Sequence, residues 1–312
     1  MPDRIQGSWL DFHHPNPWEA DYWNYATADF TEDDWDAKLG EMRELGIEDI
    51  IVLSVALHGK SFYPSRHFPM RWNLTCLDPI AAVLSAAERH QQRVHLGLGF
   101  FRTPVIHDFD HLDELVSFSL TVAGELEDRY GHYPAFSGWY FPVEAGIDGV
   151  FPPRYVEYVN ALAAGCRTLT ASRTTLIAPF GTSSIDFGPA FQSQVADLQV
   201  DFVAYQDEAG VKRLPPEEIA LTFRRLREVH AHASAALWAD IEVFDFDNRR
   251  LGPAPIDRVV AQIQGVGPSV ERLLCYQYLG MMNKSEEPAF AGHPKSLAFR
   301  QDYLDYLARL PA

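Results

Sequence analysis

The sequence alternates between short apolar runs and longer segments with helical signals, and this alternation constrains the fold more than any other feature. The apolar runs have the length and composition of strands that are buried on both faces, as in parallel sheets. The expected strands begin at residues 7, 49, 94, 138, 175, 201, 236 and 272. The expected helices cover residues 31–45, 78–90, 111–130, 153–169, 190–198, 215–232, 256–265 and 295–310. Eight strands that alternate strictly with eight helices predict a closed (β/α)8 barrel.

The same pattern predicts a single TIM-barrel domain over residues 1–312. A chain of 312 residues in which 47% are apolar can form one large core, and barrels of this size often stay undivided. The alternative is a doubly wound open sheet with additional strand–helix units. The first strand–helix connection contains no GxGxxG sequence, which disfavours the dinucleotide-binding form of that fold.

Charge and cysteine content limit the partners and the compartment. The formal net charge is −17, so neither nucleic acid nor an anionic membrane surface is expected to bind. A small-molecule or oligosaccharide substrate is the expected partner, and the oligomeric state stays open. The three cysteines, Cys76, Cys166 and Cys275, are far apart and show no metal-binding spacing, which is typical of reduced thiols. With no apolar leader and no segment long enough to span a membrane, the sequence predicts a soluble cytoplasmic protein.

Two glutamates at strand ends are the expected catalytic residues. Glu144 and Glu242 each end an otherwise apolar strand, where an ionised carboxylate is costly without a partner or a purpose. If both side chains point inward, they converge over the barrel mouth, where TIM-barrel enzymes carry their active sites. Two carboxylates in one cleft are what glycoside hydrolysis requires. The alternative is that each glutamate forms a salt bridge at the rim.

Other polar and aromatic residues near the strand ends are expected to bind the substrate. These are Asp11, His13, Tyr140, Gln206, Asp207, Trp238, Asp240 and Gln277. We expect no cofactor and no bound transition metal, because the candidate ligands lack the clustered His and Cys that zinc prefers. Two alternatives stay open. One is a divalent-metal sugar isomerase or epimerase, with the ligands His13, Glu144, Asp207 and Glu242. The other is a barrel that binds or transforms an unusual small molecule without glycoside hydrolysis.

Several segments resemble an uncharacterised family of bacterial glycoside-hydrolase-like TIM-barrel domains. They are residues 7–12 (GSWLDF), 35–53, 138–144 (GWYFPVE), 178–180 (APF), 205–210 (YQDEAG) and 238–244 (WADIEVF). The resemblance covers nearly the whole chain and implies a barrel related to retaining glycosidases. These enzymes carry the acid/base glutamate on strand four and the nucleophile on strand seven, positions that Glu144 and Glu242 match. One position differs, because Val143 replaces the Asn that usually precedes the acid/base glutamate and binds the sugar 2-hydroxyl.

The surroundings of the two glutamates predict different roles. Glu144 follows Tyr140 and Pro142 on an apolar strand face, so its carboxyl is expected to be desolvated and to stay protonated as the general acid. Glu242 follows Asp240 on a more polar face and is expected to be the nucleophile. A retaining mechanism then predicts carboxyl groups about 5–5.5 Å apart.

Overall fold

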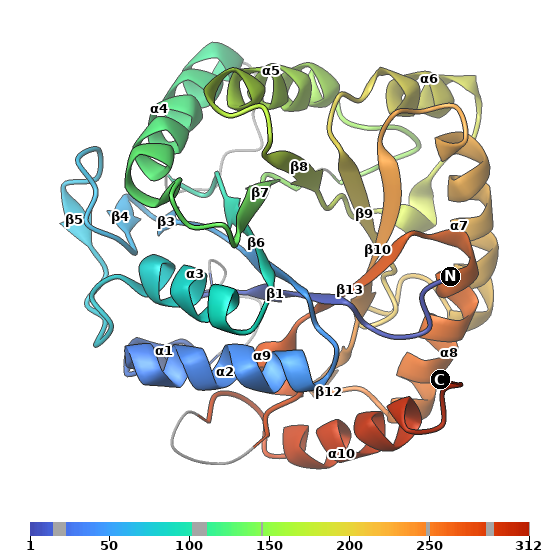
Figure 1. Ribbon diagram of the computed structural model, residues 1–312. Coiled ribbons are helices and arrows are strands. Elements are labelled where there is room, and N and C mark those ends of the chain that lie inside the picture. Colours follow the sequence, from blue (N-terminus) through green and yellow to red (C-terminus); the bar gives the residue numbers. More distant parts are fainter. Residues whose placement is uncertain (15–22, 102–110, 145, 248–249, 285–289, 312) are drawn as a thin grey trace.

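The computed structural model describes residues 1–14, 23–101, 111–144, 146–247, 250–284 and 290–311. Eight parallel strands form a closed barrel with the circular order β1-β13-β10-β9-β8-β7-β6-β2 (Figure 1). These strands are β1 (Gly7–Leu10), β2 (Asp49–Val52), β6 (Arg93–Gly97), β7 (Phe136–Phe141), β8 (Thr174–Ile177), β9 (Phe202–Gln206), β10 (Ala236–Glu242) and β13 (Arg272–Tyr276). Each barrel strand pairs with the next barrel strand along the chain, and β13 closes the barrel against β1. The predicted (β/α)8 fold is confirmed.

A helix follows each barrel strand and packs around the outside of the barrel (Figure 1). In chain order these helices are α2 (Glu32–Glu44), α3 (Pro79–Arg89), α4 (Leu112–Tyr130), α5 (Tyr155–Leu169), α6 (Pro189–Asp197), α7 (Pro216–His230), α8 (Ile256–Val266) and α10 (Ser296–Leu307). The short helices α1 (Asn24–Ala28) and α9 (Tyr278–Met281) lie in the connections after β1 and β13. None of the helices in the described ranges is both long and apolar enough to cross a bilayer.

Two small sheets extend the connections that follow β2 and β10. The first contains β3 (Ala56–Leu57), β4 (Lys60–Ser61) and β5 (Met70–Arg71), and the second is the hairpin of β11 (Phe244–Asp247) and β12 (Arg250–Pro253). The sequence pattern predicts none of these strands, because strands of two to four residues depend on their pairing partners more than on their own composition. Both sheets lie beyond the carboxyl ends of barrel strands, on the side of the molecule that carries the candidate site.

Side-chain caps define where two of the helices begin. The Thr31 hydroxyl accepts a hydrogen bond from Asp34 N at 3.2 Å, and the Asp34 carboxylate accepts one from Thr31 N at 2.8 Å. This reciprocal arrangement is the capping box expected at the start of α2. The Asp78 carboxylate caps α3 by accepting a hydrogen bond from Ala81 N, without a reciprocal bond, and Asp78 directly precedes the proline at the first helical position.

The interior of the barrel is an apolar cluster separate from the core beneath the helices. It contains Trp9, Ile51, Leu53, Tyr140, Leu176, Ala178, Ala204, Trp238 and Leu274. The intervening strand residues, such as Leu237, Ala239 and Ile241 on β10, belong to the larger core between barrel and helices. Because side chains alternate between the two faces of a strand, Asp240 and Glu242 lie on the same inward-facing side of β10 as Trp238.

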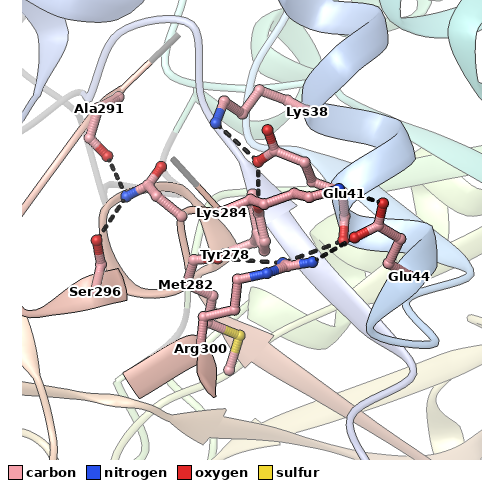
Figure 2. A network of polar contacts seen from close by, with 10 residues as sticks. Lys38, Glu41, Glu44, Tyr278, Met282, Lys284, Ala291, Ser296 and Arg300 are labelled. Carbon is pink, nitrogen blue, oxygen red and sulfur yellow. Dashed lines mark hydrogen bonds and ion pairs between the residues drawn. The ribbon is translucent and has the colours of Figure 1, made fainter. Parts of the chain in front are cut away.

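A partly buried polar network anchors the chain that leaves β13 (Figure 2). The fully buried Lys38 ammonium and the Tyr278 hydroxyl both donate hydrogen bonds to the Glu41 carboxylate. Arg300 on α10 donates to the Glu44 carboxylate at 2.8 Å. The network thus joins α2 and α10 to the connection that begins directly after β13.

Candidate active site

Glu144 lies three residues beyond the end of β7, at the mouth of the barrel. Its Oε1 accepts a hydrogen bond from the Tyr140 hydroxyl at 3.2 Å. Tyr140 is fully buried in the barrel interior, where its ring contacts Trp9 edge-on at a centroid distance of 5.7 Å. The Glu144 side chain itself is only half-buried. A rigid inner residue thus orients a carboxyl group that keeps access to solvent.

Glu242 is the last residue of β10 and is almost completely buried, with 3% of its surface exposed. Its Oε2 accepts hydrogen bonds from the backbone N–H groups of Gly210 at 2.6 Å and Val211 at 2.9 Å. A Cβ atom at position 210 would lie 2.8 Å from Phe244 atoms and 3.0 Å from Glu242 Oε2. The approach of this loop to the carboxylate therefore requires glycine.

Burial decides the ionisation of Glu242. Desolvation, followed by the negative charge of Asp207, raises the pKa of Glu242 to about 8, although the two backbone donors favour the ionised form. The expectation that Glu144 is the more desolvated of the two carboxyls was wrong. The connection after β9 packs against Glu242, whereas Glu144 lies beyond its strand and is half-buried.

Asp240 is close enough to both glutamates for their charges to raise its pKa. It lies on the inner phase of β10, two residues before Glu242, and 3% of its surface is exposed. Burial raises its pKa well above the ordinary value, and the charges of Glu242, Asp207 and Glu144 add to this effect. Its Oδ1 has no hydrogen-bond partner among the described residues. A buried carboxyl group whose pKa is raised therefore lies near both catalytic candidates.

Asp207 lies between the Glu242 backbone and helix α8. It does not line the barrel mouth, contrary to its predicted role in substrate binding. Its Oδ1 accepts hydrogen bonds from the N–H groups of Ala209 and Glu242, both at 3.2 Å, and Oδ2 accepts one from Gln262 on α8. Asp207 comes two residues after Tyr205, whose side chain packs in the core between barrel and helices. Because strand side chains alternate between the two faces, the Asp207 side chain also points outward, toward α8. Burial raises its pKa to about 6.

Trp238 also differs from its predicted role. Its ring stacks on Phe202 at a centroid distance of 4.0 Å, and both side chains line a cavity of about 670 Å³. Other residues of that cavity, such as Arg93 and Arg272, begin their strands, so the cavity lies at the amino ends of the strands. Trp238 therefore fills the opposite end of the barrel from the two glutamates.

The remaining predicted residues lie at or near the carboxyl ends of their strands. The Gln277 side chain donates a hydrogen bond to Asp11 Oδ2 at 3.2 Å, and both residues are buried. Desolvation raises the pKa of Asp11 to about 6. Gln206 is half-buried at the end of β9, with its amide donating to Ala178 O at 3.4 Å. His13 is half-buried, and its ring stacks on Trp72 at 4.1 Å.

Tyr276 belongs to the mouth but was absent from the predicted set. It pairs in register with Glu242 and contacts the inner apolar cluster. Its ring lies 6.0 Å from the ring of Phe244 and 6.1 Å from that of His14. Alternation from Leu274, two residues earlier, is the sequence signal that identifies it. The Gly210 and Val211 donors were also missed, because backbone groups of a loop leave no side-chain pattern.

The ligand set of the metal-dependent alternative is not assembled. Asp207 directs its carboxylate toward Gln262 and the backbone of Glu242, away from His13. In the part of the chain that the structure describes, no three His, Cys, Asp or Glu side chains form a group that could hold a metal ion. The four residues do not fit an oxygen-rich divalent-metal site.

Residues 5–291 match the model of a family described as a domain of unknown function, DUF4434. The chain belongs to the DUF4434 family. This confirms the resemblance to an uncharacterised TIM-barrel family. A search of curated proteins finds no match.

Solved structures similar to this DUF4434 protein are TIM barrels at low sequence identity. An alpha-L-fucosidase candidate from Bacteroides thetaiotaomicron has a TM-score of 0.80 and 18% identity, and covers 98% of this chain and 93% of its own. The AHE enzyme from Alicyclobacillus herbarius has a TM-score of 0.61 and 10% identity, over 100% and 98% of the two chains. A GH5_18 protein from Streptomyces cattleya, in complex with Manβ1-4GlcNAc, has 0.57 and 16%, over 100% and 82%. At these identities the similarity establishes the fold.

Proposed function

We propose that this DUF4434 protein is a carbohydrate-active enzyme, a retaining O-glycosidase that uses Glu144 as acid/base and Glu242 as nucleophile. The carrying observation is that the two glutamates lie at the carboxyl ends of the fourth and seventh barrel strands, at the same end of the barrel, with Asp240 under the electrostatic influence of both. The substrate is a glycoside or an oligosaccharide, and no cofactor is required. The glycosidase names of two structural relatives support a carbohydrate substrate.

The environment of Glu242 suits a nucleophile that must be held in one orientation. Two N–H donors fix Oε2, and the connection after β9 packs against the side chain. In the first step a Glu242 oxygen attacks the anomeric carbon, while the bond from that carbon to the leaving oxygen breaks. The electron pair of the broken bond stays on the leaving oxygen.

The environment of Glu144 suits an acid that becomes a base. In the first step its proton passes to the leaving oxygen, and in the second its carboxylate removes a proton from water. That water oxygen then attacks the anomeric carbon and releases Glu242. Glu144 is half-buried, so it can exchange protons with solvent between turnovers. The Tyr140 hydroxyl holds it in place.

The sugar 2-hydroxyl must be bound without the usual asparagine. Val143, which occupies that position, is buried in the core beneath the helices. Tyr276 is the polar-tipped side chain nearest in register to Glu242. We assign it to the sugar-binding surface together with the half-buried His13 and Gln206, and we assign the buried, hydrogen-bonded pair of Asp11 and Gln277 to the support of that surface.

A glycoside panel tests this function. Wild-type protein is expected to hydrolyse at least one 4-nitrophenyl glycoside, among α- and β-anomers of neutral and acidic sugars. Glu242→Gln should lower kcat/KM at least about 100-fold, because it removes the nucleophile. Glu144→Gln should lower kcat by a similar factor, because the second step loses its base, even though 4-nitrophenolate can leave without an acid. Glu157→Gln on the exposed face of α5 is the matched control and should keep full activity. Activity that survives both active-site substitutions would disprove the mechanism.

A further inference from the structure

Two basic side chains contact Trp72 at one side of the barrel mouth, and a third lies close to one of them. The His13 ring stacks on the indole at 4.1 Å, and Lys60 Nζ lies 4.9 Å from the indole centre. His58 and Lys60 both act electrostatically on His13. We refer to His13, His58, Lys60 and Trp72 as the basic cluster.

Two members of the basic cluster, His58 and Lys60, belong to the β3–β4 hairpin. Strands β3 and β4 form a hairpin in which His58 and Gly59 are the two turn residues, with φ of 53° and 77°. Positive φ at both positions is typical of a type I′ turn. The N–H groups of these residues donate to Phe100 O at 3.2 Å and Phe101 O at 2.8 Å, just beyond the end of β6. The hairpin is thereby fastened to the carboxyl edge of the barrel.

The position of the basic cluster relative to the glutamates follows from the strand order. His13 follows β1, and the hairpin follows β2. In the closed barrel, β1 lies two strands from β10 and β2 lies two strands from β7. The basic cluster is therefore midway between the two glutamate-bearing strands on that side of the mouth. A sugar bound between Glu144 and Glu242 presents a substituent or a neighbouring unit to it.

The charge of the basic cluster contrasts with that of the rest of the chain. Acidic residues outnumber Lys and Arg by 43 to 26, and the net charge is −17. Lys60 nevertheless forms no ion pair with any carboxylate in the described ranges, and its recorded contact is the face of Trp72. A half-buried ammonium that has no carboxylate partner among the described residues can bind an anion through a charge-assisted hydrogen bond.

We propose that the basic cluster binds an anionic group of the substrate, and that the enzyme therefore acts on glycosides of acidic sugars. This inference rests on the proposed glycosidase function. The anionic group is a carboxylate, as in uronic acids, or a sulfate ester. Lys60 supplies the positive charge, His13 and His58 supply hydrogen-bond donors, and Trp72 limits the orientations of the Lys60 side chain.

Binding measurements on a catalytically inactive variant test the proposal. In the Glu242→Gln protein, titration calorimetry at low salt compares the methyl glycosides of glucose and galactose with those of their uronates and 6-sulfates. At least one acidic sugar should bind about tenfold or more tightly than its neutral counterpart. A preference for the uronates identifies the bound group as a carboxylate, and a preference for the 6-sulfates identifies it as a sulfate. Adding Lys60→Met should abolish the preference, whereas Lys60→Arg should keep it. Lys295→Met, at an exposed position before α10, is the matched control and should change nothing.

The outcomes separate this inference from the proposed function. Equal affinity for acidic and neutral sugars, no binding of any probe, or a preference that survives Lys60→Met would overturn the acidic-sugar site. Lys60-dependent binding of acidic sugars without hydrolysis of any glycoside by wild type would support the binding site and count against the glycosidase. Hydrolysis of neutral glycosides alone would support the glycosidase and count against the acidic-sugar site.

Discussion

At the scale of single residues, burial and hydrogen bonding act on Glu242 in opposite directions. Two backbone donors stabilise its carboxylate, but desolvation and the charge of Asp207 outweigh them and raise its pKa to about 8. The first step needs Glu242 ionised and Glu144 protonated, so the reactive form of the enzyme carries one proton on the pair of glutamates and kcat/KM should be bell-shaped in pH. We therefore expect one limb of the profile near pH 8, well above the ordinary range of a glutamate, and assign it to Glu242.

Replacing Asp207 with asparagine tests the origin of this shift. The Asn oxygen can keep the hydrogen bonds from Ala209 and Glu242, and Gln262 can turn its unpartnered oxygen toward the new amide. Without the negative charge, the pKa of Glu242 falls, and the limb of the kcat/KM profile near pH 8 should move to lower pH. The pH profiles of wild type and Asp207→Asn give the answer. A limb that stays in place would show that Asp207 does not set this pKa.

At the scale of elements, the strands were predictable and the connections between them were not. Alternation along β10 and β13 identifies which side chains face the interior, and applied to β9 it also turns Asp207 outward. Loop backbone has no such period, so the amide donors to Glu242 could not be found from sequence. The same holds for the β3–β4 hairpin, whose two-residue strands exist through tertiary pairing. The sequence pattern also did not show how far along its strand a residue lies from the barrel mouth. Trp238 was predicted to bind substrate but lies at the opposite end of the barrel.

The fit of the β9 connection against Glu242 predicts a steric effect. In Gly210→Ala the new methyl would approach Phe244 and the Glu242 carboxylate to 2.8–3.0 Å, so the loop must shift and the two N–H donors with it. Misplacing the carboxylate by about 1 Å should lower kcat/KM about 100-fold. Gly124→Ala on α4 is the matched control, because its Cβ would meet nothing within 4 Å. That variant should keep full activity and gain about 0.5–1 kcal/mol in free energy of unfolding. Equal kinetics for the two variants would show that the loop does not position Glu242.

At the scale of the whole molecule, the closed barrel determines which residues can act together. Strict strand–helix alternation was enough to predict it, because a chain of eight such units has few other ways to bury every strand on both faces. Closure brings Glu144 and Glu242 to one end of the barrel, although they lie far apart in the sequence. It does not assign their roles. The more buried Glu242 has the raised pKa of a general acid, whereas strand position and fixed orientation favour it as the nucleophile.

Azide rescue with an activated aryl glycoside tests the paired-glutamate mechanism and its role assignment most directly. Azide occupies the space left by a truncated glutamate and attacks the anomeric carbon, in place of the carboxylate in Glu242→Gly and in place of water in Glu144→Ala, where it displaces Glu242. Glu242→Gly should yield a glycosyl azide of inverted configuration, and Glu144→Ala one of retained configuration, as shown by NMR of the products. The opposite pattern would exchange the two roles. Wild-type turnover by both variants, on every substrate that the native enzyme accepts, would contradict the mechanism.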